Sequence, residues 1–250
     1  MPDLVFGRHS CIGAINREDN KRALAYFQRA IELDPKFALA WAQAASCYWQ
    51  RVSWRWVEDA AVEAREAERL SRQALALDAN DPRVLTHAGM TLCLACNLLE
   101  EGLLLLEKAT ELDSNLFLAW LQRGIAAQAL GQASAPFLER ALRLSPRDFR
   151  APAAQSRLAM AYSFAGDHAK AVEYAEAALR NVPKKLPPIM LAAIVAYAQA
   201  GRVDRAKVIA AEFLRLNPNA KIAELLTTSP HAAKNQKILA EACRLAGLPE

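Results

Sequence analysis

A short helix-ending pattern recurs along the chain and constrains its fold more than any other feature of the sequence. Each copy has an alanine or phenylalanine in an apolar stripe, followed within a few residues by Asp, Ser or Asn and usually by proline. Aligned on that residue, the copies fall at Ala30, Ala74, Ala109, Ala141, Ala178 and Phe213, with separations of 44, 35, 32, 37 and 35 residues. Proline cannot continue a helix, so each copy predicts a helix end. A repeat of this length indicates stacked units rather than one globular core.

The composition favours helices for these units. Apolar residues make up 53% of the chain, and Ala and Leu, which favour helix, supply much of this fraction. Runs of β-branched residues are scarce. We therefore predict an all-α fold and expect no strand.

After the predicted helix ends, aromatic and small residues recur at similar spacing: Trp41, Ala45 and Tyr48 in one repeat, Gly89 in the next, Trp120, Gly124 and Gly131 after it, and Tyr162, Gly166 and Ala171 further on. This pattern resembles that of the tetratricopeptide repeat family. The resemblance implies two antiparallel helices per repeat, with small residues at the close crossings. We expect a right-handed superhelical solenoid of about six helix pairs over residues 1–218, with capping helices over residues 219–250.

A narrower resemblance concerns residues 4–35 and 245–250. These segments are similar to the carboxy-terminal repeat region of bacterial class III adenylate cyclases and winged-helix regulators. The resemblance implies a cyclase or winged-helix effector as one kind of partner. The chain is then either a free-standing relative or a part separated from its effector domain, and both alternatives stay open.

Both ends of the array have recognisable helix signals. Residues 3–15 are expected to form the first helix, and Asn16 can cap the next one. At the other end we predict helices over residues 220–226 and 230–246. We expect them to cover the apolar side of Val208, Ala211 and Leu214, as a terminal unit must.

The second repeat is longer than a typical unit, and residues 50–59 contain its extra length. Three tryptophans, Trp49, Trp54 and Trp56, crowd into this region. They either cover the longer helix or loop, or form an aromatic anchor for a partner, because tryptophan is enriched at binding hot spots.

Charge and hydropathy exclude several classes of partner. The net charge of +4 comes from 31 basic and 27 acidic residues that are interspersed along the chain. Without a dense basic cluster, nucleic-acid binding is not expected. No apolar run approaches the roughly 18 residues of a membrane span and no signal peptide is evident, so a cytoplasmic location is expected.

The sequence lacks the patterns that catalysis, metal binding or cofactor binding would require. The four histidines are scattered over different repeats, and no Gly-rich loop is present. Cys93 and Cys96 form a CxxC, but zinc needs four ligands and no second pair lies nearby. All five cysteines suit a reducing compartment, where free thiols behave as small buried hydrophobes. We therefore expect no cofactor, no metal and no enzymatic activity.

Binding of a protein or peptide is the remaining function. In the tetratricopeptide family, the first helix of each repeat lines a concave groove that receives a peptide or a helix of a partner. The residues of these helices that avoid the packed stripe are the candidates for partner binding: Trp49, Gln50, Arg83, His87, Gln122, Arg157 and Met160. The arginines among them favour a peptide that carries an acidic group.

Overall fold

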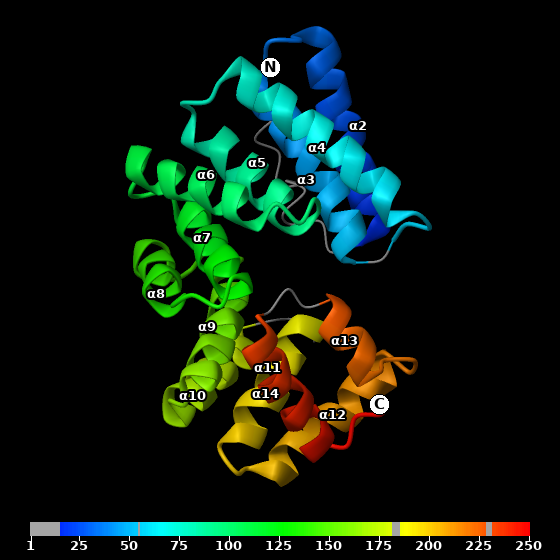
Figure 1. Ribbon diagram of the computed structural model, residues 1–250, viewed down its shortest axis with the longest axis vertical. Helices are drawn as coiled ribbons and strands as arrows, with labels where there is room; N and C mark the ends of the chain where they lie inside the picture. Colours follow the sequence, from blue (N-terminus) through cyan, green and yellow to red (C-terminus); the bar gives the residue numbers. More distant parts are fainter. Residues whose placement is uncertain (1–15, 55, 182–185, 229–231) are drawn as a thin grey trace. The chain divides into compact units, whose positions relative to one another are not determined.

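The computed structural model describes residues 16–54, 56–181, 186–228 and 232–250, and throughout these segments all regular secondary structure is helical. The helices are α2 (Arg17–Leu33), α3 (Ala38–Ser53), α4 (Ala60–Leu77), α5 (Pro82–Leu94), α6 (Leu99–Leu112), α7 (Phe117–Ala129), α8 (Ala135–Leu144), α9 (Ala151–Ala165), α10 (His168–Arg180), α11 (Pro187–Gln199), α12 (Val203–Leu216), α13 (Ile222–Thr228) and α14 (Ala233–Leu245) (Figure 1). The predicted all-α fold is confirmed. The expected helix over residues 3–15 lies outside the described residues.

The chain forms two compact units, Met1–Ala126 and Ala127–Glu250. Unit 1 contains α2 to α6, unit 2 contains α8 to α14, and α7 includes the boundary. The division into an array over residues 1–218 and capping helices over residues 219–250 stays a prediction.

The helix ends follow the pattern on which the repeats were aligned. In five copies the N–H that follows the helix donates to the carbonyl of the aligned residue, at 2.9 to 3.1 Å: Asp34 to Ala30, Asp78 to Ala74, Asp113 to Ala109, Ser145 to Ala141, and Asn217 to Phe213. All five aligned residues are buried. The repeated sequence therefore corresponds to a repeated helix end, with the aligned side chain packed inward.

The same turns fix the start of the following helix. Asp34, Asp78 and Asp113 each accept a backbone N–H from two residues further on, at 2.8 to 3.0 Å. The indole N–H of Trp41 donates to Pro35 O at 3.0 Å, and that of Trp120 donates to Ser114 O at 2.9 Å. An Asp side chain bonded to nearby backbone stabilises such a turn, and the two tryptophans brace it in equivalent ways.

Glycines set the crossing of α5 and α6 in unit 1, as the position of Gly89 predicts. A Cβ added to Gly89 would lie 2.9 Å from Gly102 O, and one added to Gly102 would lie 2.5 Å from Gly89 O. The two backbones are therefore in direct contact, which larger residues would prevent.

The tryptophan-rich insertion extends α3 to Ser53, and the cap of α4 at Asp59 follows it. The rings of Trp54 and Trp56 stack with centroids 6.1 Å apart. Both tryptophans are half-buried, as is Trp49. Packing against one another accounts for part of this aromatic cluster.

In unit 2, helix α11 is buried on all sides from Ile189 to Ala198. Helix α14 lies against α11 and α12, and the N–H of Ile222 donates to Pro249 O at 2.8 Å (Figure 1). Val208 is 63% exposed and Ala211 is also exposed. The expectation that the terminal helices cover these two residues is therefore wrong, because α14 instead packs mainly on α11.

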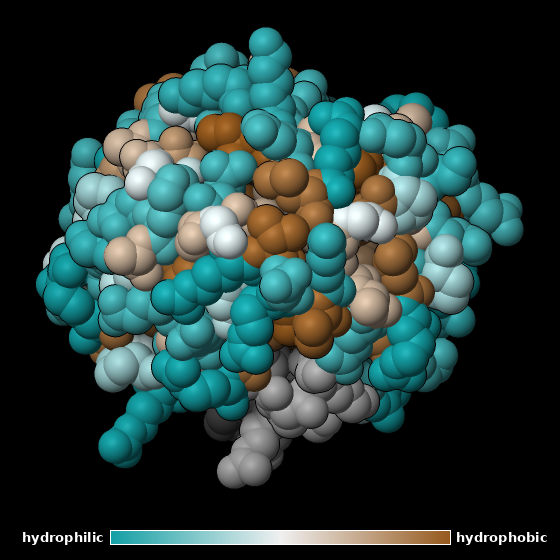
Figure 2. Space-filling view, turned by 90° about the horizontal axis from the view of Figure 1, so that it is seen from below, coloured by the Kyte–Doolittle hydropathy of each residue, from teal (hydrophilic) through white to brown (hydrophobic). Residues whose placement is uncertain are grey.

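Apolar side chains also reach the surface. Figure 2 shows hydrophobic residues gathered in patches between hydrophilic ones on the face that it presents. Phe149 and Leu245, both in unit 2, are among the exposed large apolar residues. None of the helices in the described part of the chain is both long enough and apolar enough to span a bilayer.

Among the cysteines that the structure describes, Cys93, Cys96 and Cys243 are free thiols. Burial raises the pKa of Cys93 and Cys243 to about 12 and that of Cys96 to about 11, so all three thiols stay protonated at neutral pH. Cys47 is disulfide-bonded, and the expectation of a free thiol is wrong for this residue.

Candidate functional site

The candidate residues on α3 lie within a network of hydrogen bonds. Gln50 is buried, and its Oε1 accepts a hydrogen bond from Asn20 Nδ2 at 3.0 Å. Asn20 also donates to Cys47 O at 3.0 Å and accepts from Arg51 Nε at 2.8 Å. Trp49 is half-buried, and its indole N–H has no partner among the described groups. Gln50 therefore joins α2 to α3.

His87 on α5 is also buried, and its Nδ1 lies 3.0 Å from Ser46 Oγ. Ser46 Oγ also lies 3.3 Å from Ala42 O, to which it can donate, and the tautomer of His87 decides which group donates between Ser46 Oγ and His87 Nδ1. His87 therefore joins α5 to α3.

Arg83, at the start of α5, is exposed but paired. Its guanidinium bonds Asp81 at 2.6 and 3.0 Å, and Asp81 also caps α5 by accepting the Arg83 N–H at 2.8 Å. The bond to Asp81 raises the pKa of Arg83. Burial alone would raise the pKa of Asp81, but the hydrogen bonds and the charge of Arg83 outweigh burial, so the pKa of Asp81 is lowered. A partner's acidic group would therefore compete with Asp81 for Arg83.

Gln122 on α7 is buried, and its Oε1 has no hydrogen-bond partner in the part of unit 1 that the structure describes. A buried oxygen without a hydrogen bond lowers the stability of the fold, because it has lost its contacts with water. Gln122 is therefore an acceptor for water or for a ligand N–H.

Arg157 on α9 differs from the other arginine of the predicted set. Its side chain is half-buried, and no carboxylate of the described residues pairs with it. Burial without a compensating charge lowers the pKa of its guanidinium. By contrast, Arg150, at the start of α9, bonds Asp148 at 2.7 Å. An arginine rarely loses water without a counter-charge, so Arg157 is the cation of the set that most needs an external anion.

The local fold holds Arg157 in place. Helix α9 has Pro152 in its first turn and ends at Gly166 in a left-handed conformation with φ of 80°. The Arg157 carbonyl accepts Gln128 Nε2 at 3.2 Å. Met160, Ala161 and Phe164 follow Arg157 at i+3, i+4 and i+7 and so share its face of α9. Met160 itself is buried.

The structure divides the seven predicted residues between the two units. Unit 1 holds Trp49, Gln50, Arg83, His87 and Gln122, and unit 2 holds Arg157 and Met160. Gln50, His87, Gln122 and Met160 are buried, so their side chains do not form an open surface. That all seven line one groove stays a prediction.

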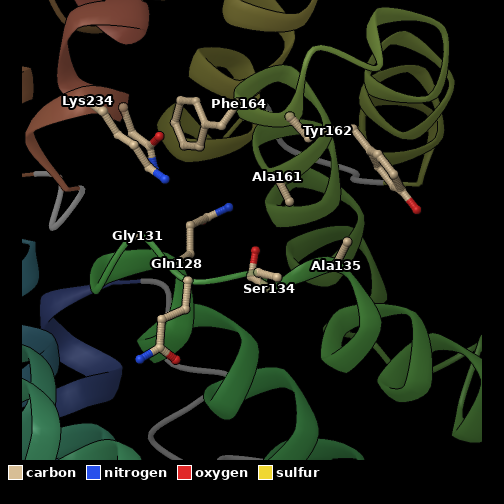
Figure 3. A pocket seen from close by; sticks show the side chains of 12 residues that line it. Gln128, Gly131, Ser134, Ala135, Ala161, Tyr162, Phe164 and Lys234 are labelled. Atoms are coloured by element: carbon tan, nitrogen blue, oxygen red, sulfur yellow. The ribbon is translucent and has the colours of Figure 1, made fainter.

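Sequence reasoning missed a cavity of about 290 Å³ in unit 2, which Figure 3 shows. Ser134 and Lys234 both line it. From the local sequence, Ser134 is expected to cap a helix, and Lys234 is expected to be a solvated charge on the last helix. Only the approach of α14 to the α7–α8 turn brings them together. No group of three or more potential metal ligands occurs among the residues that were placed.

The fold and these sites define a class of helical-repeat proteins. A family model of the tetratricopeptide repeat matches residues 14–37 and 152–184. These segments contain α2 and the pair α9 and α10. No curated protein matches the sequence.

Solved structures show the same fold. The crystal structure of PilW, a widely conserved type IV pilus biogenesis factor, has a TM-score of 0.62 at 22% identity, over 87% of this chain and 94% of that one. A chain of the APC/C hetero-tetramer Cut9–Hcn1 has a TM-score of 0.64 at 16% identity, over 92% of this chain and 50% of that one. YrrB, described as a TPR protein with an unusual peptide-binding site, has a TM-score of 0.50 at 20% identity, over 77% of this chain and 93% of that one. The tetratricopeptide model thus matches two segments of the chain, and the solved structures share the fold.

Proposed function

We propose that the chain is a non-catalytic scaffold that binds a segment of a partner protein. Its fold supports this role, because stacked helix pairs present extended surfaces that such proteins use for binding. YrrB, which shares the fold, is a peptide-binding protein by its description. The bound segment is a peptide or helix, and it carries at least one acidic group.

The observation that carries the proposal is the half-buried, unpaired guanidinium of Arg157. A carboxylate of a partner would restore the solvation that burial removes from this group, through a charge-assisted hydrogen bond. The exposed arginines are less suited to this role, because water already solvates them and a surface pair adds little. The apolar side chains that share the α9 face would contact the rest of the segment.

The test begins with selection of binding peptides from a random display library, with the full chain as bait. Affinity for the selected peptides is then measured with wild type, Arg157→Ala and Arg147→Ala. Arg147 is a matched control in the same unit, because it is an exposed arginine on the loop before α9. A charge-assisted bond contributes roughly 1.5 to 3 kcal/mol, so Arg157→Ala should weaken binding about tenfold or more.

Two results would contradict the proposal. One is a selected set without acidic residues, and the other is equal affinity of the two variants. Circular dichroism of Arg157→Ala serves as the folding control, since its half-buried side chain should leave the helix content unchanged.

The finer parts of the functional hypothesis stay predictions. They are a regulatory role beside a cyclase or winged-helix effector, and a cytoplasmic location. An adjoining reading frame for such an effector would favour the regulatory role.

A further inference from the structure

The cavity in unit 2 lies where three parts of the chain meet. The end of α7 and the turn to α8 contribute Gln128 and Ser134, the second half of α9 contributes Ala161 and Phe164, and the start of α14 contributes Lys234 and Asn235. Its volume of about 290 Å³ is at the small end of the range for ligand pockets. A small organic ligand would fit.

Polar residues with little exposed surface line the cavity. Ser134 is 4% exposed and Asn235 is 5% exposed. Ser134 occupies the cap position of α8, yet its side chain does not cap that helix. Figure 3 shows its hydroxyl directed into the cavity. Neither side chain makes a hydrogen bond to any described group, and their polar atoms stay open to the cavity because neither is fully enclosed. The fully enclosed oxygen without a partner among the lining residues is Gln128 Oε1, an acceptor that does not itself favour an anion.

The charge of the cavity is positive. Lys234 lines it, no carboxylate of the described chain pairs with the Lys234 ammonium, and no acidic residue is among the lining residues described. Helices α8 and α14 both begin at the cavity, and neither has a side-chain cap. The first N–H groups of a helix lack acceptors within the helix and favour an anion. Pro136 has no N–H, and the Asn235 N–H donates to Ala232 O at 2.8 Å. The N–H groups of Ala135 and Ala233 can therefore add to the side-chain donors of Ser134 and Asn235.

The opposite wall is apolar. Ala161, Phe164 and Ala165 of α9 line it. The hydroxyl of Tyr162 points away from the cavity (Figure 3). This hydroxyl donates a hydrogen bond to Glu139. That acidic group therefore lies outside the cavity and does not oppose an anion within it.

Gly131 allows two walls of the cavity to lie close to each other. Gly131 has φ of 72°, and a Cβ added there would lie 2.7 Å from Ala232 Cβ. A glycine at this turn both allows the left-handed conformation and permits the start of α14 to approach.

We propose that this cavity binds a small organic monocarboxylate. The carboxylate accepts hydrogen bonds from Lys234, Ser134 and Asn235, and its apolar body contacts Phe164 and Ala161. One ammonium balances one negative charge, so a monoanion suits the site better than a dianionic phosphate. Ala161 and Phe164 also lie on the face of α9 that carries Arg157, so the cavity adjoins the proposed peptide site, but the benzoate test uses no peptide and can fail independently of it.

The test uses benzoate as the probe, benzamide as its neutral counterpart and inorganic phosphate as the competing anion. The full chain is labelled on its alanine methyl groups, and the NMR signals of Ala135 and Ala161, which line the cavity, report binding there. The variants are Lys234→Ala, Ser134→Ala and the matched control Lys237→Ala. Lys237 is an exposed lysine of the same helix and does not line the cavity.

We expect benzoate to shift both methyl signals in a saturable way and benzamide to shift them little at the same concentration. Lys234 is exposed, and a surface ion pair contributes little, so Lys234→Ala should weaken benzoate binding only about three- to fivefold. Lys237→Ala should leave it unchanged, because only the first variant loses a charge beside the bound carboxylate. Ser134→Ala should weaken binding severalfold without lowering the melting temperature, since the hydroxyl caps no helix. The proposal is overturned if benzoate gives no saturable shift, if benzamide binds equally well, if phosphate binds more tightly, or if the two lysine variants behave alike.

Discussion

Replacement of Gly102 by alanine tests the crossing of α5 and α6. A Cβ added to Gly102 would lie 2.5 Å from Gly89 O, 2.7 Å from Cys93 Cβ and 2.9 Å from Cys93 N. Two of these three atoms belong to the backbone, so no rotamer change can relieve the contact. The helices would have to move apart, and the side chains between them would lose contacts.

Two opposing effects decide the magnitude. Alanine is favoured over glycine within a helix by about 1 kcal/mol. Overpacking in a well-packed interior costs roughly 1 to 3 kcal/mol, and contact with backbone places Gly102→Ala in the upper part of that range. The expected net result is a loss of about 1 to 2 kcal/mol in the free energy of unfolding.

Urea unfolding followed by circular dichroism measures this change. The control is Glu111→Ala on the exposed side of the same helix, which should stay within about 0.5 kcal/mol of wild type. If the two units unfold in separate steps, the change should appear in the step of unit 1. Equal or greater stability of Gly102→Ala would refute the close backbone contact.

Two further predictions concern ionisable groups. The pKa of Asp148 is lowered because, although burial would raise it, hydrogen bonds from the Arg150 side chain and N–H outweigh that effect; its stabilising contribution is therefore present above a pH of about 4 and is lost as the pH falls through the folded value. Asp148→Asn should lower the free energy of unfolding by about 1 to 2 kcal/mol at pH 7. This difference in stability between variant and wild type should disappear as the pH is lowered. A difference that persists at pH 2 would contradict the prediction. A brief iodoacetamide pulse at pH 8 should leave Cys93 and Cys243 unlabelled in the native chain and labelled in urea, because burial raises the pKa of both thiols to about 12; rapid native labelling, read by mass spectrometry of the peptides, would show that the thiols are accessible thiolates.

The repeat boundaries could be predicted from the sequence because they depend on local chemistry. A cap such as Asn16, whose Oδ1 accepts the Asp19 N–H at 2.8 Å, needs only residues close in sequence. Pro136 lies in the first turn of α8, where its missing N–H costs nothing. Such signals are complete within a few residues.

The candidate binding residues were harder to predict because their surroundings come from other repeats. Gln50 and His87 are polar residues off the apolar stripe, a pattern that is also typical of a solvated face. In the fold they pair with Asn20 of α2 and Ser46 of α3, respectively, and are buried. A helical period shows which face is apolar, but it does not show whether a polar face meets a polar partner.

The cavity in unit 2 illustrates the same limit over a longer separation. Ser134 and Lys234 are 100 residues apart in the sequence. The return of α14 to the α7–α8 turn, where Gly131 permits close approach, places them in one cavity. No local pattern encodes that contact.

A charge-exchange experiment at Arg157 tests the proposed function most directly. The affinity of a selected acidic peptide is measured for wild type and Arg157→Glu, and both measurements are repeated with a peptide whose acidic residue is replaced by lysine. The proposal predicts that Arg157→Glu weakens the acidic peptide about tenfold or more, and that the lysine peptide binds Arg157→Glu more tightly than wild type. Equal affinity of the lysine peptide for both proteins would contradict direct pairing with Arg157.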